Sequence, residues 1–317
     1  MTYFILILGF VLLIKGADYF VDAASNIASI LRISPILIGL TIVAFGTSSP
    51  EAAVSIRAAM KGNNGIALGN VIGSNMFNMS LVVGITAFIN PLKVEKETVR
   101  KEIPFTLLSS VLLLIVMMDI RLQAMSSNQL TRGDGLVLLS FFTIFLYYLF
   151  EVARNSKEKN DEEKNPLLRN MRKNIIFTVG GLTAIVLGGE LVVKSSKEIA
   201  YSLGMSETLV GLSIAAVGTS LPEMITCITA AAKKHSDIAV GNIVGSNIFN
   251  ILFVLGTSSV ISPIYVEEKI FIDVLFMIVY TSILLIFSRT YHKVSRLEGA
   301  ILFLSYILYA IYIIIRR

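Results

Sequence analysis

Ten apolar stretches, separated by short polar turns and one long polar segment, make up the chain. The stretches fall near residues 3–22, 36–60, 66–90, 104–119, 134–150, 174–194, 208–232, 238–262, 270–288 and 298–315. Since a membrane-crossing helix needs about 20 predominantly apolar residues, the pattern predicts an all-α integral membrane protein with ten transmembrane helices. The polar segment, 151–173, predicts a solvated linker between a first unit, 1–150, and a second, 174–317.

Composition supports a membrane protein and excludes several other classes. Charged residues make up 15% of the chain and hydrophobic residues 55%, whereas a soluble domain carries about 25% charged residues. A single cysteine, Cys227, excludes a disulfide framework, a Cys-based zinc site and an iron–sulfur cluster, and the two histidines disfavour a His-ligated metal centre. We expect no cofactor, no nucleic-acid partner and no obligatory protein partner.

The distribution of basic residues predicts the orientation of the chain. The N-terminus is apolar from the start and lacks the basic residues of a cleavable signal peptide, so it is expected to remain as the first helix. With the N-terminus outside, 17 of the 27 Lys and Arg residues lie in cytoplasmic segments and nine lie on the opposite side. The positive-inside rule therefore favours a multi-pass protein of the cell membrane with both termini outside and the 151–173 linker in the cytoplasm.

Two sequence motifs occur twice at the same spacing. The segment 39–51, GLTIVAFGTSSPE, recurs at 211–223 as GLSIAAVGTSLPE, with nine of thirteen positions identical at an offset of 172 residues. The segment 69–78, GNVIGSNMFN, recurs at 241–250 as GNIVGSNIFN, with seven of ten positions identical at the same offset. The chain is therefore expected to consist of two repeats with five helices each.

The odd number of helices in each half determines how the two halves are related. Five crossings leave the second half starting on the opposite side of the membrane, so the halves are expected to have inverted topology. Inverted repeats around a site near the bilayer midplane are typical of secondary transporters. The pattern favours a transporter that works by alternating access over a static pore.

Each repeat carries a glutamate within an apolar stretch, Glu51 and Glu223. A carboxylate at the centre of a membrane costs at least ~2.5–3.5 kcal/mol, so it indicates a function or a partner. The prolines directly before the glutamates, Pro50 and Pro222, are expected to break the helix and to free main-chain oxygens. Hydroxyl groups lie within one turn of the glutamates, at Thr47, Ser48, Thr219 and Ser220.

The second motif of each repeat places polar side chains on one helical face. Asn70, Ser74 and Asn78 are four residues apart, as are Asn242, Ser246 and Asn250. Close helix packing accounts for the glycines, and hydrogen bonds of side-chain amides between helices account for Asn70, Asn75, Asn242 and Asn247. We expect Ser74, Asn78, Ser246 and Asn250 to face the glutamates instead.

These groups together offer carboxylate, hydroxyl, amide and main-chain oxygens, and neither histidine nor cysteine. All-oxygen coordination suits hard cations such as Ca²⁺ and Na⁺ and disfavours zinc, copper and iron. The residues by themselves therefore predict a cation site at the midplane of an inverted-repeat carrier.

The paired motifs resemble the two alpha repeats of the calcium/cation antiporter superfamily, in particular those of the prokaryotic sodium/calcium exchanger family. The resemblance covers essentially the whole chain. It implies an exchange of Ca²⁺ for Na⁺, with the site built by the second, third, seventh and eighth helices. It also implies that Ca²⁺ is bound by Glu51, Glu223 and the main-chain oxygens of Thr47 and Thr219, and that the Na⁺ sites add Ser48, Ser74, Ser220, Ser246 and the carbonyls of Ala44 and Ala216.

One position departs from part of that superfamily. Some members carry an aspartate at one of the two last motif positions, whereas this chain carries Asn78 and Asn250. The change removes an ionisable group and argues against potassium co-transport.

Other functions and other residues have simpler interpretations. A Ca²⁺/H⁺ antiporter of the same superfamily is the main alternative, because two membrane glutamates can also carry protons. A channel or an intramembrane enzyme ranks third, because the spans lack a catalytic arrangement of residues. Asp18 and Glu190, which are repeat-related, are expected near helix ends and close to the membrane interface. The charged run 157–164 lacks the ligand spacing of an EF-hand.

Overall fold

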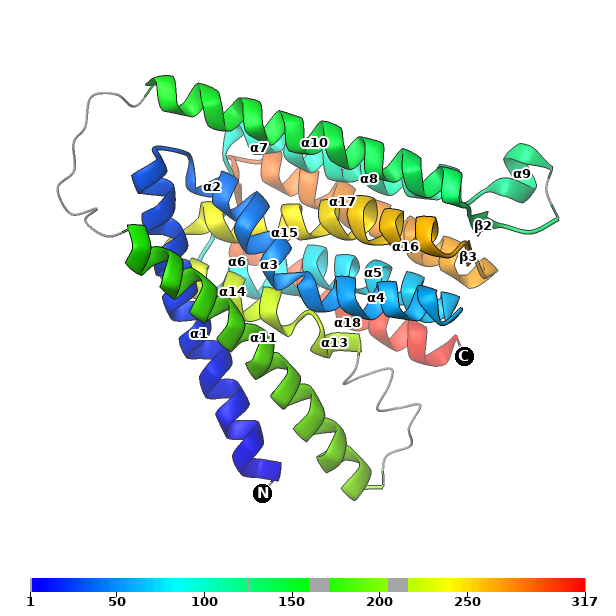
Figure 1. Cartoon of the computed structure of the whole chain (residues 1–317), viewed down its shortest axis with the longest axis horizontal. Helices are drawn as coiled ribbons and strands as arrows, with labels where there is room; N and C mark the ends of the chain where they lie inside the picture. Colours follow the sequence, from blue (N-terminus) through cyan, green and yellow to red (C-terminus); the bar gives the residue numbers. More distant parts are fainter. Residues whose placement is uncertain (1, 125, 160–170, 205–215, 317) are drawn as a thin grey trace.

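The computed structural model describes residues 2–124, 126–159, 171–204 and 216–316, and the described chain is almost entirely helical (Figure 1). Seven of its helices are long and apolar enough to cross a membrane, and one bent pair of helices passes the same test. The seven are α1 (Thr2–Leu31), α5 with its continuation (Asn64–Ile89), α10 (Arg132–Lys159), α11 (Met171–Ser202), α15 with its continuation (Ser236–Ile261), α17 (Glu268–Arg289) and α18 (Arg296–Ile315). The protein is therefore a multi-spanning helical membrane protein.

The remaining apolar stretches form shorter helices. The bent pair consists of the segment Pro35–Thr47 and α4 (Ser49–Met60). Stretch 104–119 forms α8 (Glu102–Val116), and the described part of stretch 208–232 forms α13 (Ala216–Gly218) and α14 (Leu221–Ala232). The helix α10 continues nine residues into the predicted linker, and residues 160–170, with most of the charged run 157–164, lie outside the described residues. The first eight residues of stretch 208–232 also lie outside them.

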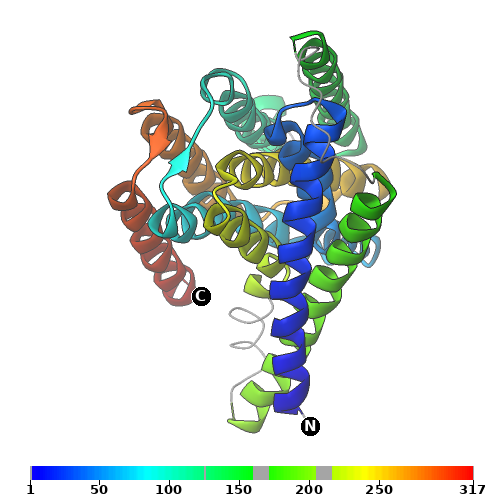
Figure 2. The ribbon, with the colours of Figure 1, turned by 90° about the vertical axis from the view of Figure 1, so that its left-hand side faces the viewer.

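Helices α1 and α11 pack against each other along their length and cross the other helices obliquely (Figure 2). Glycines at the contact allow the close approach, because a Cβ at Gly16 or Gly181 would lie 2.9 or 2.8 Å from a main-chain oxygen of the facing helix. With 30 and 32 residues, at 1.5 Å per residue, both helices are longer than the ~30 Å hydrocarbon core.

The length of these helices corrects one expectation. Asp18 and Glu190 lie in the middle of α1 and α11, not near the helix ends. The expected first span ended at residue 22, whereas the helix continues through alanines and ends at Leu31, where Arg32 takes a left-handed conformation with φ 56°.

The two motif-bearing segments are broken helices. The first runs through α2 (Pro35–Ile38), the π-helix η1 (Gly39–Val43) and α3 (Ala44–Thr47), and then bends by 48° before α4. The break lies at Ser48, with φ −82° and ψ 6°, two residues before the proline. Pro50 lies in the first turn of α4, where its missing N–H would have had no partner. Ser220 makes the same break before α14, with φ −91° and ψ 6°.

The helices that carry the second motif contain wide turns. In the first half α5 (Asn64–Phe77) continues as the π-helix η2 (Asn78–Val82) and α6 (Val83–Ile89). In the second half α15 (Ser236–Ile248) continues as η4 (Phe249–Leu255) and α16 (Gly256–Ile261). Both π-helical segments begin within the last two residues of the motif. Segments of this kind are frequent at functional sites.

Short elements complete the fold and connect the two halves. The helices α7 (Lys96–Arg100) and α9 (Asp119–Gln123) flank α8. Strand β1 (Leu92–Lys93) pairs antiparallel with β4 (Lys293–Val294), and β2 (Gln129–Leu130) pairs with β3 (Ile264–Tyr265). Each two-stranded sheet joins one strand from each half of the chain, so the halves are tied together away from the centre of the bundle.

Candidate cation-binding site

The two glutamates lie in the first turns of α4 and α14 and are buried. Glu51 is 0% exposed and Glu223 is 1% exposed. Each is bonded by a serine from the opposite half: Ser220 Oγ donates to Glu51 Oε1 at 3.0 Å, and Ser48 Oγ donates to Glu223 Oε1 at 2.8 Å. The N-terminus of a helix also favours negative charge. The helix breaks therefore bring the two repeats together at the carboxylates.

The serines of the second motif line the same site. Ser74 Oγ lies 3.5 Å from Glu51 Oε1 and 2.8 Å from Ser220 Oγ. Ser246 Oγ donates to the carbonyl oxygen of Ala44 at 3.4 Å. Both serines are buried, and the structure brings each of them to the broken helix of a repeat.

The threonines at the breaks are bonded across the halves by asparagines. Thr47 Oγ1 donates to Asn242 Oδ1 at 3.1 Å, and Thr219 Oγ1 donates to Asn70 Oδ1 at 3.2 Å. Asn70 also donates to the carbonyl oxygen of Glu51 at 3.2 Å. The hydrogen bonds between helices that were expected of Asn70 and Asn242 are present, and their partners are residues at or next to the helix breaks.

The last asparagine of each motif forms a hydrogen bond to the opposite half through its side-chain nitrogen. Asn78 Nδ2 donates to Asn247 Oδ1 at 3.3 Å, and Asn250 Nδ2 donates to Asn75 Oδ1 at 3.1 Å. These hydrogen bonds use the Nδ2 atoms, so the Oδ1 atoms of Asn78 and Asn250 take no part in them. The predicted interhelical amide bonds are present, because Asn75 Nδ2 also donates to the carbonyl oxygen of Asn247 at 3.2 Å.

Four buried oxygens of the site have no hydrogen-bond donor among the described residues. They are one carboxylate oxygen of each glutamate and the side-chain oxygens of two asparagines: Glu51 Oε2, Glu223 Oε2, Asn78 Oδ1 and Asn250 Oδ1. Unsatisfied buried acceptors are costly, and a hard cation satisfies such oxygens directly. Neither glutamate forms an ion pair within the described ranges, and no cluster of three or more His, Cys, Asp or Glu occurs there.

The remaining predicted residues are placed as follows. Ala44, the first residue of α3, is buried, and its carbonyl accepts from Ser246. Ala216 is the first residue of α13. Cys227 is fully buried beside Asn242.

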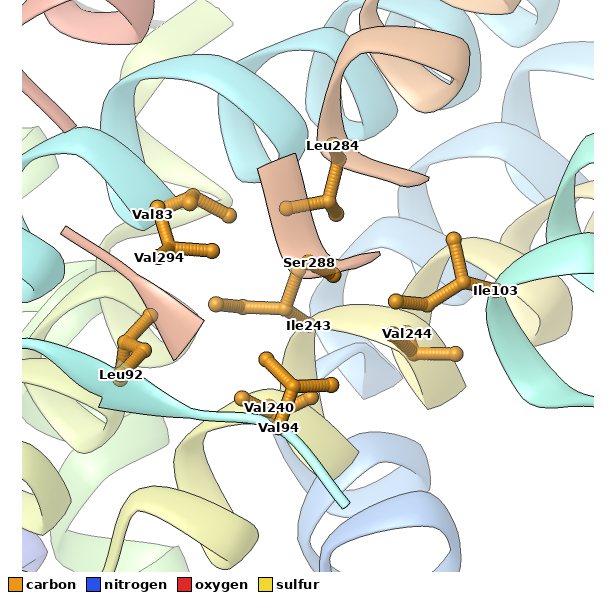
Figure 3. A pocket seen from close by; sticks show the side chains of 10 residues that line it. All are labelled: Val83, Leu92, Val94, Ile103, Val240, Ile243, Val244, Leu284, Ser288 and Val294. Carbon is orange, nitrogen blue, oxygen red and sulfur yellow. The ribbon is translucent and has the colours of Figure 1, made fainter. Parts of the chain in front are cut away.

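A separate pocket lies between the β1–β4 sheet and the surrounding helices (Figure 3). Its lining is apolar, with Val83, Ile103, Val240 and Leu284 among the side chains, and Ser288 supplies the one hydroxyl. Because it offers no carboxylate, this pocket does not resemble a cation site.

Broken helices around a buried, oxygen-lined site in a multi-spanning bundle are typical of secondary transporters. The model of the family described as "Sodium/calcium exchanger protein" matches residues 1–151 and 173–315. The chain belongs to this family, whose members are transporters and not enzymes.

Curated relatives and solved structures agree with this assignment. The chain is 34% identical to the sodium/calcium exchanger MaX1 of Methanosarcina acetivorans, over 98% of this chain and 97% of the relative. It is 24% identical to the Ca²⁺/H⁺ antiporter ChaA of Bacillus subtilis, over 95% of this chain and 89% of the relative. A solved structure of the sodium-calcium exchanger NCX_Mj, soaked with Na⁺ and Sr²⁺, superposes with a TM-score of 0.84 at 30% identity, covering 97% of this chain and 96% of that one.

Proposed function

We propose that this protein is a secondary antiporter that exchanges Ca²⁺ for Na⁺ by alternating access. The ions are its transported substrates, and they bind between the broken helices at Glu51 and Glu223. The names of MaX1 and NCX_Mj, both sodium/calcium exchangers, support the choice of ions.

The observation that carries the proposal is the pair of buried carboxylates, each with one oxygen lacking a donor. Two carboxylates supply two negative charges, which one Ca²⁺ neutralises. In the proposed Ca²⁺ site the main-chain oxygens of Thr47 and Thr219 complete the coordination, because both residues lie at the helix breaks. In the proposed Na⁺ sites the ligands also include Ser48, Ser74, Ser220 and Ser246, the carbonyls of Ala44 and Ala216, and the side-chain oxygens of Asn78 and Asn250.

The proposed architecture has ten transmembrane helices in two five-helix repeats of inverted topology. The reciprocal bonds support it, since Ser48 and Ser220 each bond the glutamate of the opposite repeat. The turn after each broken helix also repeats: Gly62 and Lys234, 172 residues apart, both have a positive φ, 71° and 66°. The repeats span 1–150 and 174–317, with 151–173 as a cytoplasmic linker and both termini outside.

A Ca²⁺/H⁺ antiporter is the second candidate. Two observations favour it: the site holds two buried carboxylates, which can carry protons, and the chain is similar to ChaA of Bacillus subtilis over 95% of its length.

Calcium uptake into vesicles distinguishes the two candidates. The purified protein is reconstituted, and uptake of radioactive Ca²⁺ is followed with an outward Na⁺ gradient or with a proton gradient as the only driving force. We expect the Na⁺ gradient to drive uptake. Uptake driven by protons alone would favour the second candidate, and no uptake with either gradient would reject both.

A further inference from the structure

An ion-pair cluster joins α1 to the turn that follows α14. Lys233 Nζ lies 2.7 Å from Asp18 Oδ1 and 2.7 Å from Asp22 Oδ1, and it donates to the carbonyl oxygen of Asp18 at 2.8 Å. The two aspartates are one turn apart on α1, so the lysine bridges them. None of these three residues contacts Glu51 or Glu223 through a hydrogen bond or ion pair in the described part of the chain.

The internal repeat contains a second copy of this cluster, and that copy is open. Residues 172 positions from Lys233 and Asp18 are Lys61 and Glu190, which again offer a lysine after a broken helix and a carboxylate in the middle of a long helix. No ion pair joins Lys61 to Glu190 in the part of the chain that the structure describes, and both residues are exposed. Asp22 corresponds to Lys194, so the second copy has at most one carboxylate.

The surrounding helices show the same asymmetry. Helix α1 packs along α14, whereas the C-terminal part of α11 lies apart from α4 and α5 in Figure 1. That turn and the α14–α15 turn lie at opposite ends of the bundle (Figure 1). The structure therefore has one end held by an ion-pair cluster and the other end without its counterpart.

We infer that Lys233, Asp18 and Asp22 are positioning residues that hold one of the two conformations of the carrier, and that Lys61 and Glu190 hold the other. The inference rests on the proposed inverted-repeat transport. In a carrier built from two inverted copies, the opposite-facing state is reached when the two halves exchange conformations. That exchange closes the Lys61–Glu190 pair and opens the Lys233 cluster.

Calcium-for-calcium exchange in vesicles of one orientation tests the inference, because it requires no counter-ion. The half-saturating Ca²⁺ concentration is measured on each face with the other face saturated. Apparent affinity at a face scales with the population of the state open to that face. The ratio of the two affinities therefore follows the equilibrium between the two states.

The two lysines are expected to act in opposite directions. Lys233→Ala should change the affinity ratio by about threefold to tenfold, as expected for loss of partly exposed ion pairs. Lys61→Ala should change it in the opposite direction and by a smaller factor, because its pair has one carboxylate. The double variant should lie between the two single variants. The matched control is Lys234→Asn, which removes a neighbouring positive charge and tolerates the left-handed backbone; it should leave the ratio unchanged.

Two further variants separate positioning from general damage. The charge swap Asp18→Lys with Lys233→Asp should restore the wild-type ratio, a result that a merely structural role does not produce. Should Lys233→Ala fail to insert, Asp22→Asn removes one of the two pairs and should shift the ratio about twofold in the same direction.

The outcomes distinguish this inference from the proposed function. If the wild type exchanges calcium while Lys233→Ala leaves the ratio unchanged, or Lys61→Ala shifts it in the same direction, the ion-pair inference is wrong and the transport proposal stands. If the wild type moves no calcium in any assay, both fail.

Discussion

At the scale of single residues, the site is organised by hydroxyl and amide groups that cross between the repeats. Ser48 and Ser220 each donate to the carboxylate of the opposite half, while Asn70 and Asn242 each accept from a threonine of the opposite half. Hydrogen bonds to charged groups are worth about 1.5–3 kcal/mol. Each carboxylate is therefore positioned by one half of the chain and oriented by the other.

The first prediction concerns the glutamates. Glu51→Gln and Glu223→Gln should each abolish exchange, because each removes one of the two negative charges that balance Ca²⁺. Glutamine keeps the size of the side chain and removes only the charge, so both variants should insert and purify normally. The measurement is Na⁺-driven Ca²⁺ uptake, and wild-type uptake by either purified variant would disprove the assignment.

The second prediction separates the two ions at Ser48. In the proposed site its hydroxyl serves Na⁺, so Ser48→Ala should raise the half-saturating Na⁺ concentration by about tenfold, the effect of one lost interaction of ~1.4 kcal/mol. The Ca²⁺ affinity should change less. Ser49→Ala is the matched control, since Ser49 is exposed and its hydroxyl donates to the carbonyl oxygen of Gly46. Equal losses for both ions would place Ser48 in the calcium site instead.

At the scale of elements, the fold contains two kinds of helix: broken helices at the candidate site and a pair of long helices, α1 and α11. The broken helices place Glu51 and Glu223 in the first turns of α4 and α14, and the long pair α1 and α11 packs closely through glycines. At Gly181 the facing atom is the carbonyl oxygen of Gly16, and main-chain atoms cannot move aside as a flexible side chain can. The pair therefore tolerates little added volume at its contact.

The third prediction tests this contact. Gly181→Ala should destabilise the protein by about 1–3 kcal/mol through overpacking, because its Cβ would lie 2.8 Å from the Gly16 oxygen. The neighbouring Gly180→Ala is the control: a Cβ there meets no described atom within 4 Å, and alanine favours a helix by about 0.5–1 kcal/mol. Thermal unfolding in detergent measures both. Equal melting temperatures of the two variants would show that the added methyl group at position 181 does not destabilise the helix contact.

At the scale of the whole molecule, the charge of the site decides how transport responds to voltage. The proposed site carries two negative charges, because positions 78 and 250 are both asparagine. One Ca²⁺ neutralises the site, whereas three Na⁺ leave it with a charge of +1. The two ions share the carboxylates, so they should exclude one another.

The fourth prediction holds for an exchange of three Na⁺ for one Ca²⁺. Calcium efflux against sodium entry should be electrogenic, and an inside-negative potential should accelerate it. Each net charge that crosses the membrane changes the free energy of transport by ~2.3 kcal/mol per 100 mV. Vesicles held at different potentials with a potassium ionophore provide the test. A flux that does not respond to voltage would instead indicate two-for-one exchange or exchange for protons.

The sequence by itself determined the membrane class, the order and approximate positions of the apolar helices, and the two glutamates, Glu51 and Glu223, that the structure buries in the motifs. Each apolar stretch is helical in its described part, because a buried segment without water must satisfy its own backbone hydrogen bonds. The repeated motifs were visible because the same residues recur at a single offset, at Glu51 and Glu223 among others. These features depend on local composition and spacing, so the one-dimensional pattern contains them.

Only the tertiary structure decided which groups meet. The break at Ser48 instead of Pro50, the pairing of Asn78 with Asn247, and the bridge from Lys233 to Asp18 join residues or backbone geometries that no local pattern specifies. Lys233 and Asp18 are far apart in the chain and come together because the long α1 packs along α14. Contacts of this kind depend on how helices cross, and crossing geometry is set by the packing of all the helices together.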